Sequence, residues 1–139
     1  LIWGQQPDDP LPANLPVHYS GHISGTHTLS RHYSASTLFL CPSRADNLPN
    51  TVLESLACGT PILGSEVGGI PDMVRPGQTG WLFPGDTPAA CAQALQSALA
   101  ERPTWPTLQT QCREIAEAEY SLSLQATRYQ QLIAELCSE

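Results

Sequence analysis

Two short apolar runs, each followed by polar turn residues, mark the middle of the chain. The first run covers residues 37–42 and the second covers residues 61–65, and both predict buried strands. Between them, apolar positions repeat at helical spacing from about Pro49 to Cys58, with Gly59 just after the end. This stretch therefore predicts a helix that buries one face against the strands.

Helical periodicity dominates the second half of the chain. A short helix is expected around Pro71–Val74, and a Gly-Gln-Thr-Gly turn then leads into another strand, Trp81–Phe83. Longer helices are expected over Pro88–Glu101, from Thr104 to about Glu119, and from Ser123 to about Leu136. Strands separated by helices predict an α/β fold, with a Rossmann-like parallel sheet covered by helices on both faces and a helical C-terminal part over about residues 88–139.

The first third of the chain is less regular. Leu1–Gly4 is expected to be the end of a strand, Gln5–Pro16 a proline-rich loop and Val17–Gly21 a short strand. Thr28–Ser34 is expected to form a short helix with a serine or threonine cap. A length of 139 residues fits one domain with a sizeable core, so we expect a single domain over residues 1–139.

Composition excludes several classes of function. The net charge is −7 and all six basic residues are arginine, without a basic run, so we expect no nucleic-acid partner. No apolar run approaches the roughly 18 residues of a membrane span, and no signal peptide is evident. The four histidines lack metal-ligand spacing, so no metal site is expected. Five scattered cysteines, none in a Cys-x-x-Cys pair, indicate reduced thiols in a cytosolic protein.

The richest chemistry lies between the first predicted strand and the helix after it. Asp46 and Glu54 bracket the expected helix start, and this loop falls at the carboxyl end of a strand, where α/β folds bind ligands. The N–H groups and positive dipole end of a helix start suit a phosphate. Ionised carboxylates only accept hydrogen bonds, so the two acids suit hydroxyl groups. A phosphate with many hydroxyls describes a nucleotide sugar.

The surrounding residues resemble a known family. Asp46, seven intervening residues and Glu54 resemble the E-x7-E signature of family 4 retaining glycosyltransferases, which have the GT-B fold. Pro42–Ser43 resembles the strand end before this signature. The segments Glu54–Ser65, Gly68–Val74 and Gly77–Phe83 continue the family pattern in register. The resemblance covers residues 1–100 firmly and the helical tail loosely, and it implies the C-terminal, donor-binding half of a GT-B enzyme.

The resemblance implies a role for each acid, and each role has a plainer alternative. Glu54 would accept hydrogen bonds from both ribose hydroxyls of the donor, whereas otherwise it is a solvent-facing glutamate favoured by the helix dipole. Asp46 would contact hydroxyls of the transferred sugar, or alternatively cap the junction between loop and helix. The family usually has glutamate at this position, so the shorter aspartate implies a closer sugar or a bridging water.

Other residues of the segment complete the expected donor site. Asn50 and Thr51 are assigned to the diphosphate, or else to helix capping, and Leu48 to apolar contact; Pro49 departs from the usual glycine and has no N–H to offer. Arg44 is expected to pair with a phosphate or with Asp46. The Gly68–Gly69 pair is expected to form a tight turn rather than to hold a phosphate. The remaining donor-binding candidates are Ser43, Asn47, and, beside the nucleotide base, Gly21 and His22; alternatively, His22 is an ordinary loop histidine.

The family comparison also implies absent parts. One strand-and-helix unit that carries an Arg and a Lys, and the whole acceptor-binding N-terminal half, would precede Leu1. The lost strand is expected to leave a gap that rearrangement closes or a partner fills. We therefore expect this chain alone to bind its donor, such as a UDP- or GDP-sugar, weakly or not at all and to transfer no sugar. No cofactor or metal is implied.

The full-length enzyme is expected in the cytoplasm of a bacterium, free or peripheral at the inner membrane, with surface polysaccharide synthesis as its setting. Two alternatives stay open: a non-catalytic nucleotide-binding or interaction module, and a sugar-nucleotide epimerase on the same fold. A dinucleotide oxidoreductase is disfavoured, because no Gly-x-Gly-x-x-Gly follows a strand.

Overall fold

The computed structural model describes residues 1–3, 14, 16–85 and 87–137. These residues form two compact units, Leu1–His32 and Tyr33–Glu139, and each unit is described by itself. The predicted loop Gln5–Pro16 lies outside the described residues apart from Asn14 and Pro16, and Gly4 of the first predicted strand lies outside them as well. The expectation of a single domain stays a prediction.

The first unit contains one parallel bridge and most of a helix. Ile2 pairs with Tyr19, through hydrogen bonds from the Ile2 N–H to His18 and from the Ser20 N–H to Ile2, both 2.9 Å long. Among the described residues, the two predicted strands form a single bridge, because two short segments alone do not sustain a ladder. Helix α1 (Thr26–Ala35) confirms the predicted short helix and begins two residues earlier than expected.

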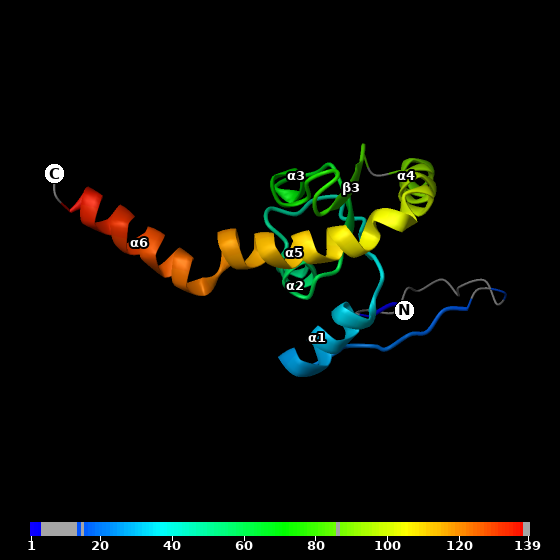
Figure 1. Ribbon diagram of the computed structural model, residues 1–139, viewed down its shortest axis with the longest axis horizontal. Helices are drawn as coiled ribbons and strands as arrows, with labels where there is room; N and C mark the ends of the chain where they lie inside the picture. Colours follow the sequence, from blue (N-terminus) through cyan, green and yellow to red (C-terminus); the bar gives the residue numbers. More distant parts are fainter. Residues whose placement is uncertain (4–13, 15, 86, 138–139) are drawn as a thin grey trace. The chain divides into compact units, whose positions relative to one another are not determined.

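The second unit is built on a parallel sheet, and Figure 1 labels the third of its strands. Its strands are β1 (Phe39–Cys41), β2 (Ile62–Ser65) and β3 (Gly80–Phe83), in that spatial order among the described residues. Phe39 pairs with Ile62, and Ile62 pairs in turn with Gly80. The parallel sheet expected from the sequence is confirmed, with β1 shorter at both ends than the apolar run 37–42.

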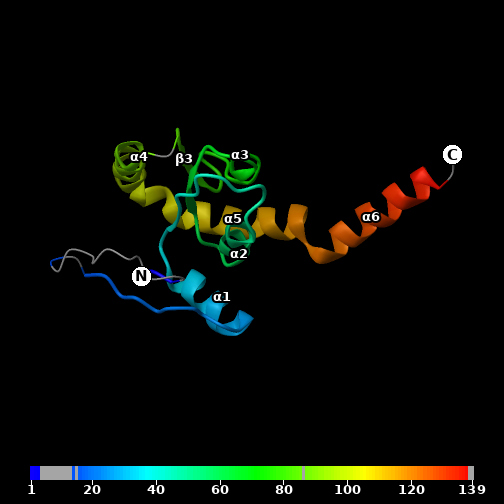
Figure 2. The same cartoon turned by 180° about the vertical axis from the view of Figure 1, so that it is seen from behind.

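Helices connect and follow these strands in the predicted order. The helix between β1 and β2 is α2 (Asn50–Ala57), and α3 (Ile70–Met73) precedes β3. After β3 come α4 (Pro88–Ala100), the 3₁₀ turn η1 (Arg102–Thr104), α5 (Trp105–Tyr120) and α6 (Leu122–Leu136). All five predicted helices of this unit are confirmed to within two residues at each end. Figures 1 and 2 show α6 extending beyond the end of α5.

Alternating side chains of the strands fill two cores, one on each face of the sheet. The α2-side core contains Cys41, Val52, Leu56, Ile62, Ile70, Met73, Val74, Cys112 and Ala116. The α4-side core contains Leu63, Trp81, Phe83, Ala98, Trp105 and Leu108. Adjacent residues of β2 enter opposite cores, as the two-residue period of a strand requires. Helices on both faces of the sheet are therefore confirmed.

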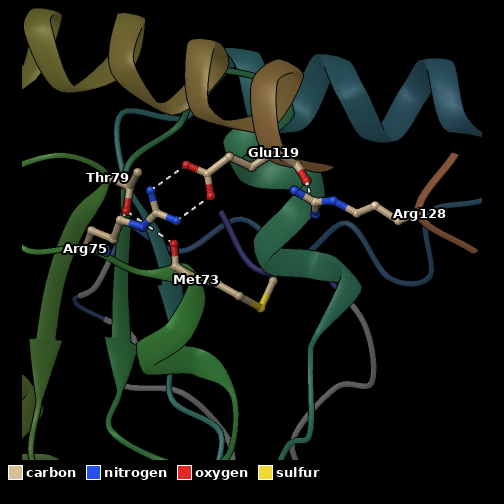
Figure 3. A network of polar contacts seen from close by, with 5 residues as sticks. All are labelled: Met73, Arg75, Thr79, Glu119 and Arg128. Carbon is tan, nitrogen blue, oxygen red and sulfur yellow. Dashed lines mark hydrogen bonds and ion pairs between the residues drawn. The ribbon is translucent and has the colours of Figure 1, made fainter. Parts of the chain in front are cut away.

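Helix α5 contributes to both cores and is fastened at its C-terminal end. Trp105 and Leu108 enter the α4-side core, whereas Cys112 and Ala116 enter the α2-side core. Near the end of α5, both oxygens of Glu119 accept hydrogen bonds from the guanidinium of Arg75, at 2.7 and 2.5 Å. Figure 3 shows this pair together with Arg128 of α6, which donates to the Glu119 carbonyl at 3.4 Å.

Candidate functional site

The loop between β1 and α2 begins at the carboxyl end of the sheet and is tied to the neighbouring strand. The Ser65 hydroxyl, at the end of β2, donates to the Ser43 carbonyl at 2.6 Å. The Ser43 hydroxyl itself lies 3.7 Å from the Cys41 sulfur. These bonds fix the start of the loop across the ends of two adjacent parallel strands, the usual location of ligand sites in α/β sheets.

The acidic part of the loop rests on the Gly68–Gly69 turn that follows β2. The Gly69 N–H donates to the Asn47 carbonyl at 2.8 Å. A Cβ atom on Gly69 would stand 2.1 Å from that same carbonyl oxygen, so only glycine allows this approach. The turn expected from the glycine pair therefore has a second role, because it supports the backbone of the segment that carries Asp46.

This supporting role of Gly68 and Gly69 was missed by the sequence interpretation. One signal was available: the glycine pair lies shortly after β2, as the acidic loop lies shortly after β1. The carboxyl ends of adjacent parallel strands meet at one edge of the sheet, so loops that leave them are neighbours.

Helix α2 starts without a side-chain cap. Its N-cap residue is Pro49, with φ −67° and ψ 120°, and no side-chain hydrogen bond closes this end. Proline has no side-chain oxygen that could cap the helix and no backbone N–H that could donate to a ligand, so the N-cap residue provides neither contact. Helix α2 therefore begins without the side-chain capping by Asp46, Asn50 or Thr51 that the sequence left open as an alternative. Asn50 and Thr51 are both exposed in its first turn.

Glu54 lies one turn into α2 and is held by a buried partner. Its Oε2 accepts a hydrogen bond from the Tyr33 hydroxyl at 3.1 Å. Tyr33 is 1% exposed, and its ring packs edge-on against Phe39 with ring centroids 5.4 Å apart. Burial, and then the nearby Glu54 carboxylate, raise the pKa of Tyr33, so the phenol stays protonated and remains a donor. Glu54 is therefore an anchored, half-buried side chain and not a freely solvated one.

Most of the predicted site residues lie within one continuous segment of the second unit, residues 43–54. Asp46 is half-buried, whereas Arg44, Asn47 and Leu48 are exposed beside it. Gly21 and His22 belong to the first unit, directly after the bridge residue Tyr19 and Ser20. Their assignment to the nucleotide base stays a prediction.

Two further surveys concern metals and membranes. Within residues 1–3, 14, 16–85 and 87–137, no three His, Cys, Asp or Glu side chains gather as a metal ion would require. Over the same residues, none of the helices has both the length and the apolar character needed to cross a membrane. All five cysteines are free thiols, with Cys41 and Cys112 buried.

Comparison with known proteins gives a family match over most of the chain. The family described as "Glycosyl transferases group 1" matches residues 1–101. A sulfoquinovosyl transferase of Arabidopsis thaliana is 34% identical over 107 residues, which are 74% of this chain and 21% of the relative. The chain thus spans about a fifth of the length of the curated relatives it matches.

Solved structures agree on the fold. Sucrose-phosphate synthase from Thermosynechococcus elongatus superposes with a TM-score of 0.78 at 32% identity, covering 87% of this chain and 30% of that protein. The Anabaena HepE protein, solved in complex with UDP-glucose, gives a TM-score of 0.70 at 19% identity, over 87% of this chain and 32% of that one. The fold is that of the C-terminal half of GT-B proteins.

Proposed function

Because this chain belongs to the group 1 glycosyl transferases, we propose that it is the donor-binding domain of a family 4 retaining glycosyltransferase. The full-length enzyme would transfer a hexose-type sugar from a nucleoside diphosphate to a glycan or lipid-linked acceptor. One observation carries the proposal: Asp46 and Glu54 lie on either side of the uncapped start of α2, at the carboxyl end of β1. This arrangement offers phosphate-binding N–H groups between two hydroxyl-binding carboxylates.

Several residues between Ser43 and Glu54 take separate parts in donor binding. Glu54 accepts hydrogen bonds from the ribose hydroxyls, and Asp46 accepts them from hydroxyls of the sugar to be transferred. The first turn of α2, with Asn50 and Thr51, holds the diphosphate. Ser43, Arg44, Asn47 and Leu48 belong to the same segment and offer further donor contacts.

Transfer leaves negative charge on the departing diphosphate. The positive end of the α2 dipole stabilises this charge as the sugar acquires oxocarbenium character. Arg44, exposed in the loop, adds a guanidinium that suits a phosphate in bidentate geometry. Stabilisation at the leaving group is therefore the contribution that this segment makes to the rate.

Nucleotide binding tests the role of Glu54. The full-length gene product that carries this sequence is titrated with UDP and with GDP, as wild type, Glu54→Ala and Glu114→Ala. Glu114 is an exposed glutamate of α5 and serves as the matched control. Loss of two charge-assisted hydrogen bonds predicts that Glu54→Ala weakens the preferred nucleotide about tenfold or more, with no change in Glu114→Ala. Equal affinity in all three proteins would instead favour a non-catalytic module.

Comparing nucleotide with nucleotide sugar tests the role of Asp46. If Asp46 contacts only the transferred sugar, it contributes to the affinity for UDP-glucose but not to the affinity for UDP. Asp46→Asn is therefore expected to weaken UDP-glucose, or the GDP-sugar if GDP is preferred, and to leave the free nucleotide within twofold. An equal loss of affinity for both ligands would indicate that Asp46 supports the loop and does not contact the sugar.

The proposed donor also suggests a location. Nucleotide sugars used for bacterial surface polysaccharides are cytoplasmic, so we expect the enzyme there, free or peripheral at the inner membrane. Fractionation of cells that produce the full-length gene product tests this expectation.

A further inference from the structure

Tyr33 is joined to helix α2 directly through its side chain and, by way of Thr60, through its backbone. At the side chain, its hydroxyl donates to Glu54 Oε2 at 3.1 Å. At the backbone, its carbonyl accepts a hydrogen bond from the buried Thr60 hydroxyl at 2.7 Å. The Thr60 carbonyl in turn accepts from the Ser55 hydroxyl at 2.9 Å, and Ser55 is the residue after Glu54. The bonds form a closed circuit that begins and ends on adjacent residues of one helix.

Burial keeps this circuit away from competing water. Tyr33, Ser55 and Thr60 are each at most 1% exposed, and the Tyr33 ring is packed against Phe39. The buried phenol keeps its hydrogen bond to Glu54, because an unpaired hydroxyl in such a site costs free energy. Glu54 itself is half-buried, so it keeps some contact with solvent while its Oε2 is bonded to Tyr33. One of its oxygens is therefore restrained before any ligand arrives.

We propose that Tyr33 is a positioning residue, which holds the Glu54 carboxylate for the vicinal hydroxyls of a nucleoside ribose and so sets the preference for ribonucleotides over 2′-deoxyribonucleotides. This inference rests on the proposed donor role of Glu54. With Oε2 bonded to Tyr33, Oε1 and the remaining lone pairs of the carboxylate are presented to the ligand. A glutamate already fixed in this way loses little side-chain freedom on binding, whereas a free one must be ordered by the ligand.

The experiment compares two nucleotides in two proteins. The full-length gene product, as wild type and Tyr33→Phe, is titrated with UDP and 2′-deoxy-UDP, and with GDP and 2′-deoxy-GDP. The phenylalanine keeps the ring packing and removes only the donor. Ordering one long side chain corresponds to about a three- to tenfold change in affinity. Tyr33→Phe should therefore weaken the preferred ribonucleotide about three- to tenfold and its 2′-deoxy analogue by a smaller factor, because that analogue offers Glu54 only the 3′-hydroxyl.

Controls separate positioning from a general loss of structure. Tyr129→Phe removes the hydroxyl of an exposed tyrosine on α6 and is expected to change neither affinity. In a Glu54→Ala background, Tyr33→Phe should have no further effect on nucleotide affinity, because its partner is already gone. If Tyr33→Phe does not fold, Thr60→Val releases the Tyr33 backbone from the same circuit and should reduce the ribose preference in the same direction.

The outcomes separate a failure of the positioning role of Tyr33 from a failure of the proposed donor-binding function. An equal loss for the ribo- and deoxyribonucleotide, or an unchanged ratio, would overturn the positioning role while Glu54→Ala still weakens binding. If Glu54→Ala leaves nucleotide affinity unchanged, or if neither nucleotide binds the wild type, the proposed function fails and the inference fails with it. A lost ribose preference in Tyr33→Phe, absent from the double variant, supports both.

Discussion

Gly68 lies so close to Asp46 that a Cβ atom on Gly68 would stand 1.6 Å from the Asp46 carbonyl oxygen. No rotamer change relieves this contact, because the backbone fixes the position of a Cβ atom and the Asp46 carbonyl is itself backbone. Gly68 also has φ +53°, a conformation that other residues adopt at a cost. The position of the first acid in the candidate site is thus set by a turn that lies more than twenty residues further along the chain.

Gly68→Ala should therefore displace the loop that carries Asp46. The left-handed backbone alone costs about 1–2 kcal/mol in an alanine, and the clash adds to this. Gly77→Ala is the matched control, because Gly77 has φ +77° but no atom within 4 Å of an added Cβ. Chemical denaturation and nucleotide-sugar titration should show a larger loss for Gly68→Ala in both measurements. Equal losses would mean that the turn does not constrain the loop.

Leu63 and Leu40 offer a paired test of the α4-side core. They are register partners on adjacent strands, yet Leu63 is fully buried whereas Leu40 is 42% exposed. Leu63→Ala leaves a cavity and should lower the free energy of unfolding by about 2–5 kcal/mol. Leu40→Ala should cost about 1 kcal/mol or less, because the side chain already contacts water. Urea unfolding followed by circular dichroism measures both, and comparable losses would contradict the burial difference.

The Arg75–Glu119 pair predicts a pH-dependent contribution to stability. The hydrogen bond from Arg75 lowers the pKa of Glu119 below its ordinary value of 4.5. A depressed carboxyl pKa adds stability that is present above the unfolded pKa and lost as the pH falls through the folded one. Both side chains are more than a third exposed, at 35% and 39%, so solvent screening limits the pair to roughly 0.2–1 kcal/mol.

Arg75→Gln is therefore expected to lower the free energy of unfolding by this amount at pH 7. The difference from wild type should shrink as the pH falls below the ordinary pKa of a glutamate and Glu119 becomes protonated. Urea unfolding at a series of pH values measures it, and Glu119→Gln serves as the control that removes the titrating group. If the difference in the free energy of unfolding is equally large in acid, the effect comes from packing of the aliphatic part of the Arg75 side chain and not from the ion pair.

Cys112 and Cys137 should react at very different rates with a thiol reagent. Burial raises the pKa of the Cys112 thiol to about 12, and its sulfur donates to the Thr79 carbonyl at 3.5 Å. Cys137 is exposed near the end of α6. Because the thiolate is the reactive form, maleimide should modify Cys137 within the native protein and Cys112 only after unfolding. Mass spectrometry of timed samples identifies the modified residue, and early modification of Cys112 would show that α5 opens readily.

The sheet and its helices could be predicted because each carries its own local pattern. The apolar run around Phe39–Cys41 and the helical stripe of α2 need no distant partner to be recognised. The predicted strand Val17–Gly21 failed for the opposite reason. Its sequence favours an extended backbone, but a strand is completed by neighbours, and here only Tyr19 finds one.

The residues of the candidate site could be predicted from the sequence, but the residues that hold them in place could not. Asp46 and Glu54 stand out through their spacing around a helix start. Tyr33 lies 21 positions before Glu54, and no local period connects them. The contact between Gly68 and Asp46 depends on how closely two loops approach, which is set by backbone packing and not by residue type. Such non-local contacts decide the geometry of the site, and a single sequence does not encode them in a readable pattern.

Helix α5 binds the two sides of the sheet into one thermodynamic unit. Its first half completes the core that contains Leu63, and its second half completes the core that contains Ile62. If either core opens, half of this 16-residue helix loses its packing partners, and a half of that length is too short to be stable in isolation. Hydrogen exchange should therefore report a single global opening event for β2, α2 and α5, with no intermediate in which one side has melted alone.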